Sequence, residues 1–177
     1  MKGIGYILLA LLFTSCQVVR VNVDYDKATD FTNYSTYNYF SDMKTGLSGL
    51  DEKRLIMALD NLMQNEGFLF SEEPDLLINI QSEAFKKVPG NAVGVGVGGT
   101  GRSVGGGVSI GIPLGQSKIT REIQFDFVDS QKDILIWQAI SKSAFNDNGA
   151  PSERERKLKE IAEKVLSKYP PKVKRRN

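Results

Sequence analysis

The residue with the strongest chemical character in this sequence is its only cysteine, Cys16, whose thiol is a nucleophile. It follows a charged start at Lys2, an apolar run over residues 4–13 and two small residues. This order is typical of a secretory signal peptide, and the apolar run is too short to span a bilayer. We therefore expect residues 1–15 to be a signal peptide that is cleaved before Cys16.

The residues around this cut, 12–16, resemble a lipobox, the motif at which bacterial signal peptidase II cleaves before a diacylated cysteine. Phe13 departs from the Leu, Val or Ile that usually stands three residues before that cysteine, so an ordinary signal peptide with an incidental cysteine stays an alternative. Lipidation of Cys16 would add two or three fatty chains, such as palmitate, which is enough for stable anchoring to a membrane. Gln17 stands where an aspartate retains enteric lipoproteins in the inner membrane, and this favours the bacterial outer membrane. Residues 17–20 lack the acidic cluster that resembles a surface-export tag, and this favours the periplasmic face of that membrane.

The composition argues against several classes of function. The 177-residue chain carries 23 basic and 21 acidic side chains, and this near balance argues against nucleic acid as a partner. It contains no histidine, so it cannot form Ser-His-Asp, Cys-His or histidine-liganded zinc sites. The acidic cluster Glu72, Glu73 and Asp75 is typical of a solvated turn rather than of a calcium site. We expect no enzyme activity, no cofactor and no metal.

Carboxylates are the basis of one catalytic alternative. Asp24, Asp26 or Glu83 would serve a hydrolase of envelope glycans, which needs two carboxyl groups facing each other across a cleft, about 5–10 Å apart. A further alternative is a binder of a lipid or another small apolar ligand, which needs an apolar cavity of at least roughly 300 Å³ beneath the sheet.

Residues 90–115 form a glycine-rich insert that holds eleven of the 17 glycines. Valine alternates with glycine in its first part, which predicts a hairpin or a loop. Residues 94–99 match G-x-G-x-x-G, and residues 96–103 differ from a P-loop by one residue. Both nucleotide motifs need a helix directly afterwards, but Val104 and three glycines follow, so we expect no nucleotide.

The elements that would position these residues follow from hydrophobic periodicity. Alternating apolar residues predict strands over 19–25, 36–40, 76–81, 118–128 and 134–145. Apolar stripes at helical spacing predict a helix over 51–66, ended by Gly67, and a second over 152–166, opened by a capping box of Ser152 and Glu155. We expect a single α+β domain over 16–171, with a mainly antiparallel sheet and two amphipathic helices packed on one face, followed by a basic tail over 172–177.

The order of features resembles one known family. A lipobox, the segments 21–26, 30–31, 34–37 and 74–78, a glycine-rich insert, and then 135–137 and 169–171 are similar to the bacterial lipoprotein family catalogued as domain of unknown function 4136. The resemblance implies a periplasm-facing α+β lipoprotein domain with no assigned activity and no agreed catalytic residues. The resulting expectation is a lipid-anchored, non-catalytic interaction or structural module of the envelope, which meets an unknown envelope protein or copies of itself.

Overall fold

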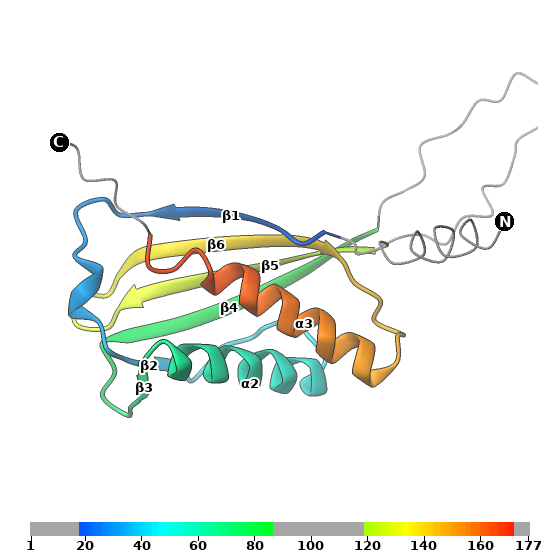
Figure 1. Ribbon diagram of the computed structural model, residues 1–177, viewed down its shortest axis with the longest axis horizontal. Coiled ribbons are helices and arrows are strands. Elements are labelled where there is room, and N and C mark those ends of the chain that lie inside the picture. Colours follow the sequence, from blue (N-terminus) through cyan, green and yellow to red (C-terminus); the bar gives the residue numbers. More distant parts are fainter. Residues whose placement is uncertain (1–17, 87–118, 172–177) are drawn as a thin grey trace, which may run out of the picture.

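The computed structural model describes residues 18–86 and 119–171 (Figure 1). The predicted signal peptide over 1–15, Cys16, the glycine-rich insert over 90–115 and the basic tail over 172–177 lie outside these residues. None of the described helices is long and apolar enough to cross a membrane.

Six strands, two α-helices and one 3-10 turn make up the described chain. In chain order they are β1 (Arg20–Tyr25), the 3-10 turn Phe31–Asn33, β2 (Thr36–Tyr39), α2 (Gly49–Asn65), β3 (Leu69–Phe70), β4 (Leu76–Lys86), β5 (Ile119–Asp129), β6 (Ile134–Ala144) and α3 (Pro151–Leu166). All five predicted strands and both predicted helices are present, and the α+β class is confirmed. β4 extends five residues beyond the predicted end at Gln81, and β3 was not predicted.

All six strands form one sheet in the order β1-β6-β5-β4-β2-β3. The first four strands in this order pair antiparallel, whereas β2 runs parallel to both β3 and β4. A parallel pair needs a crossover connection, and α2 supplies it between β2 and β3. The sheet is therefore mainly antiparallel, as predicted.

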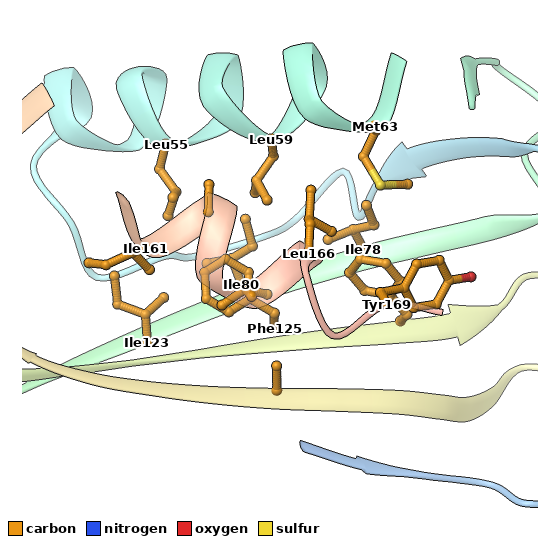
Figure 2. Close-up of a cluster of buried hydrophobic side chains, with 14 of the residues drawn as sticks. Leu55, Leu59, Met63, Ile78, Ile80, Ile123, Phe125, Ile161, Leu166 and Tyr169 are labelled. Carbon is orange, nitrogen blue, oxygen red and sulfur yellow. The ribbon is translucent and has the colours of Figure 1, made fainter. Parts of the chain in front are cut away.

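Both helices lie on one face of the sheet (Figure 1). Side chains alternate between the two faces along a strand, so every second residue of the central strands points toward the helices. Figure 2 shows these side chains meeting those of α2 and α3 in the core. The fully or almost fully buried residues of this layer include Leu55, Leu59 and Met63 from α2, Ile78 and Ile80 from β4, Ile123 and Phe125 from β5, and Ile161 from α3.

The ends of the helices differ in how they are capped. Ser48 caps α2, because its side chain accepts a hydrogen bond from the Asp51 N–H, and Gly67 follows the helix with a φ of 92°. The predicted capping box of α3 is wrong: Ala150 is the N-cap and makes no side-chain hydrogen bond. Pro151 lies in the first turn, where its fixed φ suits a helix start, and this moves the boundary one residue ahead of Ser152.

Tyr169, just after α3, closes one end of the core. Its ring contacts those of Phe127, Trp137, Phe31 and Phe68, at centroid distances from 4.7 to 5.9 Å. Phe31, from the N-terminal part of the chain, thus packs into the core.

Asp129 organises the turn between β5 and β6. Its carboxylate accepts hydrogen bonds from the backbone N–H groups of Gln131 and Lys132, from Lys132 Nζ and from the hydroxyl of Tyr34. Burial alone would raise the pKa of Asp129, but these hydrogen bonds outweigh it and lower the pKa to about 2. Asp129 therefore stabilises the turn between β5 and β6.

This low pKa predicts a loss of stability in acid. A carboxyl whose pKa is lower in the folded state stabilises the fold above its unfolded pKa, and the contribution disappears as pH falls through the folded value. For Asp129 we expect about 2 kcal/mol at pH 7, lost between about pH 5 and pH 2. Urea unfolding of Asp129→Asn and wild type at pH 7 and pH 2 checks this, with the exposed Asp42→Asn as control. A difference between Asp129→Asn and wild type that is equally large at pH 2 would contradict the prediction.

Candidate functional site

The face of the sheet that points away from both helices is polar. Alternate residues of four neighbouring strands reach it, and the register aligns them in rows across the sheet. The rows are Asp24, Gln138, Asp126 and Asn79; Asn22, Ile140, Gln124 and Gln81; and Arg20, Lys142, Glu122 and Glu83. We call the surface made by these three rows the open face.

Polar groups on the open face bond to one another. Lys142 forms an ion pair with Glu122 at 2.8 Å. Gln138 and Gln124 both donate amide hydrogen bonds to the carboxylate of Asp126, at 2.7 and 2.9 Å. Polar side chains of β5 and β6 on the open face therefore find hydrogen-bond and ion-pair partners within the sheet.

A wide hollow of about 590 Å³ lies beside these residues. It is bounded by the segment after β2, including Phe40 and Met43, and by Leu135 of β6. Its floor holds Asn79 and Asp126 from the open face, so its lining mixes apolar and polar groups. It lies on the face opposite the helices, whereas the sequence-based hypothesis of an apolar ligand requires an apolar cavity beneath the sheet.

Two of the acids named for a glycan hydrolase, Asp24 and Glu83, lie far apart in the structure. Asp24 on β1 and Glu83 on β4 share the open face, but two strands separate them and their rows lie four residues apart. Standard strand spacings put them roughly 20 Å apart, about twice the largest separation that the mechanism uses.

Asp26 serves the turn that follows β1. Its carboxylate accepts hydrogen bonds from the Ala28 N–H and the Thr29 hydroxyl, both at 2.9 Å. The hydrogen bond from Ala28, with that from Thr29, lowers the pKa of Asp26, whereas a general acid needs a raised pKa. In the described segments no group of three or more acidic, cysteine or histidine residues is arranged to hold a metal ion.

The margin of the sheet at β1 is a free backbone edge. β1 is the terminal strand of the sheet and pairs with β6 on one side only (Figure 1). The Asp26 N–H donates to the Ile136 carbonyl at 2.9 Å, so the backbone groups of Asp26 face β6. In an antiparallel pair the backbone groups of successive residues face the partner strand and the free side in turn. The backbone groups of Val21, Val23 and Tyr25 therefore point away from β6.

Asp24 already forms a hydrogen bond with one of these outward-pointing backbone groups. Its carboxylate accepts the Tyr25 N–H at 2.9 Å, whereas the outward groups of Val21 and Val23 have no partner within the described sheet. The sequence shows the alternation of β1 but does not show that the strand lies at an edge. The charges at Arg20 and Asp24 were the available signal, because edge strands commonly carry charged side chains.

The end of the sheet where β1 begins is also where the glycine-rich insert is attached. Arg20 aligns with Lys142, Glu122 and Glu83, so the first residue of β1 lies near the end of β4 and the start of β5. Residues 87–118 connect Lys86 and Ile119, which pair at this same end. The chain thus enters the fold, leaves it and re-enters it at one end of the sheet (Figure 1).

Comparison with known proteins gives a family and a fold. A family model described as "Domain of unknown function (DUF4136)" matches residues 21–171. No curated protein matches the chain in sequence.

Similar solved structures include a PDZ domain protein from Parabacteroides distasonis ATCC 8503, with a TM-score of 0.57 at 13% identity. That match covers 89% of this chain and only 37% of the other, so this chain spans well under half of that protein. Two crystal forms of the PelC dodecamer from Paraburkholderia phytofirmans give TM-scores of 0.43 and 0.45 at 9% identity, over 85% of this chain and 95% and 96% of theirs.

Proposed function

The chain belongs to the DUF4136 family of domains of unknown function, and we propose that it is a lipid-anchored, non-catalytic interaction module of the bacterial cell envelope. The lipid is carried by Cys16. Gln17 in place of an aspartate favours the outer membrane, and the absence of an acidic cluster over residues 17–20 favours its periplasmic face. The partner is another envelope protein or a second copy of the same chain.

The observation that carries this proposal is the place where the chain enters the fold. The described chain begins at Val18, two residues after Cys16, and β1 begins at Arg20. Two extended residues span roughly 7 Å, so a lipid on Cys16 holds this end of the sheet against the bilayer. Lys86 and Ile119 lie at the same end, and the glycine-rich insert is therefore attached next to the membrane.

An interaction role also agrees with the distribution of polar groups. The open face presents rows of amide and charged side chains on rigid strands, and the β1 margin presents unpaired backbone groups. Both surfaces offer hydrogen bonds to a protein partner, whereas Asp24 and Glu83 lie too far apart for paired-acid chemistry.

Replacing Cys16 with alanine tests the anchor. We expect Cys16→Ala to lose labelling by an alkyne-bearing fatty acid and to move from the membrane fraction to the soluble fraction, because its thiol is the only acylation site of this kind. The control is Ser15→Ala, which keeps a small residue before the cut. Retention of Cys16→Ala in the membrane, or a labelled Cys16→Ala, would contradict lipid anchoring.

Crosslinking in cells followed by mass spectrometry tests the interaction role in the same strains. We expect wild type to give a reproducible protein crosslink that weakens in Cys16→Ala, because tethering concentrates the module near its partner. A wild-type protein without any reproducible protein crosslink would contradict the role.

A further inference from the structure

We infer that β1 is a self-pairing edge, through which two copies of this chain join their sheets about a twofold axis at Asn22. This inference rests on the proposed role as an interaction module and gives that role a surface and a partner. It is built from three properties of β1: its free backbone groups, the spacing of its charges and the exposure of its valines.

The backbone groups fit an antiparallel partner strand. Val21 and Val23 present N–H and carbonyl groups to the free edge, two residues apart, as one side of an antiparallel ladder requires. When Asn22 lies opposite Asn22 of the second copy, Val21 of each copy lies opposite Val23 of the other. Each such pair exchanges two backbone hydrogen bonds, so the twofold contact forms four.

The charges of β1 favour this register over pairing about Arg20 or about Asp24. Pairing about Asn22 places Arg20 opposite Asp24 of the second copy, and the symmetry repeats the ion pair at the other end. Pairing about Arg20 would place two guanidinium groups opposite each other, and pairing about Asp24 would place two carboxylates opposite each other. Opposite charges facing each other across an antiparallel pair stabilise it, and like charges destabilise it.

Exposed Val23 and partly buried Val21 gain apolar partners in the same register. Val23 is 38% exposed although it lies on the helix side of the sheet. Pairing about Asn22 sets Val23 beside Val21 of the second copy on that face, so both valines lose contact with water. On the open face, Asp24 exchanges its bond to the Tyr25 N–H for the guanidinium of Arg20 from the second copy.

In this dimer the lipid anchors of both copies can enter the same membrane. A twofold axis between antiparallel strands of one sheet stands perpendicular to the sheet, so the first described residue, Val18, lies at the same distance from the plane of the sheet in both copies. Val18 aligns with Asp26 of the second copy, eight residues along the strand, which separates the two copies of Val18 by roughly 26 Å. Both lipids therefore reach the same bilayer when the joined sheet lies flat along it.

A single cysteine at the axis is the sharpest test. Across the free edge, Asn22 forms a non-hydrogen-bonded pair with itself, with a Cα separation of about 4.5 Å, within disulfide range. We expect full-length Asn22→Cys, expressed in the envelope and run on a non-reducing gel, to give a disulfide-linked dimer. Wild type shows how much dimer forms through Cys16 alone. Glu83→Cys, which places a cysteine at an exposed position of the open face on β4, is the matched control. A dimer yield of Asn22→Cys no higher than that of Glu83→Cys would overturn the inference.

Charge exchange tests the register independently. For the detergent-solubilised full-length protein we expect sedimentation equilibrium to show a dimer. We expect Arg20→Asp and Asp24→Arg each to weaken it about tenfold, because each change turns two attractions into two repulsions. The double exchange restores the opposite pairs and should restore the dimer, whereas Lys27→Asp, the same charge change just beyond β1, should have no effect.

The outcomes separate this inference from the proposed function. A monomeric wild type, an assembly of more than two copies, or a double exchange no better than the single variants would overturn β1 self-pairing. If the crosslink to a different envelope protein persists in those cases, the interaction role stands without β1 pairing. If no protein crosslink forms at all, both fail together.

Discussion

Replacing Trp137 with alanine is expected to lower the free energy of unfolding by about 3–5 kcal/mol, a large part of the 5–15 kcal/mol typical of a whole domain. The indole is fully buried on β6, and its ring packs against those of Phe127 and Tyr169 at centroid distances of 4.8 and 5.3 Å. Tyr169 follows α3 and Phe127 belongs to β5, so the cavity left by Trp137→Ala would loosen the contact between the last helix and the sheet.

The measurement is urea unfolding at pH 7, monitored by far-UV circular dichroism. The change in the free energy of unfolding is calculated from the shift in the urea midpoint, provided that the m-value stays constant. Leu135→Ala, two residues earlier on the same strand, is the control, because its side chain is 49% exposed. We expect the control to change the free energy of unfolding by less than about 1 kcal/mol. Equal effects of the two substitutions would contradict the packing described for this end of the core.

The two helices and the long strands could be predicted because their patterns are repeated over many residues. Leu55, Leu59 and Met63 show the α2 stripe directly, and Ile123, Phe125 and Phe127 show the alternation of β5. β3 could not be found in this way, because two residues show no periodicity and both are exposed. It is a strand only because Thr36 and Tyr37 of β2 offer it a partner.

The limits of β4 and α3 depend on tertiary partners rather than on local pattern. The last five residues of β4 are largely polar or exposed, and β5 keeps them extended by pairing as far as Lys86 with Ile119. At α3 the sequence contains a valid capping box at Ser152, but Pro151 starts the helix one residue earlier. Local signals of similar strength compete there, and the sequence alone does not rank them.

The candidate site was the least predictable part of the molecule. Sequence analysis identified Cys16 and the alternation of β1, but strand order decides that β1 is an edge and that Asp24 and Glu83 lie on separate strands. Strand order follows from long-range pairing, which a single sequence does not show. The self-complementary spacing of Arg20 and Asp24 points to self-pairing only when β1 is known to be an edge strand.

The second large effect is expected at Asp51, in the first turn of α2, where Asp51→Ala should cost about 3–5 kcal/mol. Its side chain is 1% exposed and accepts hydrogen bonds from Arg54, at 2.7 Å, and from Arg154 of α3. Burial opposes ionisation of Asp51, but the hydrogen bonds from Arg154 and Arg54 outweigh it and place its pKa below the ordinary value. Alanine would leave two arginine side chains that are largely buried without their shared carboxylate.

The pH dependence of this effect has a defined sign. Because the folded pKa of Asp51 is the lower one, its stabilisation is complete above the unfolded pKa of about 3.9 and is lost as pH falls through the folded value. We therefore expect the difference between Asp51→Ala and wild type to shrink in acid. Guanidinium unfolding at pH 7 and at pH 3 measures it, with the exposed Glu155→Ala of α3 as control.

A double-mutant cycle then separates the ion pair from the packing around it. If Asp51 and Arg154 act as a pair, Asp51→Ala with Arg154→Ala should cost clearly less than the sum of the two single changes, by about 1–3 kcal/mol. Additive costs would contradict a coupled pair and would assign the loss to Arg54 or to packing. Because Asp51 joins the first turns of α2 and α3, strong coupling would mean that this ion pair itself helps to hold the two helices together.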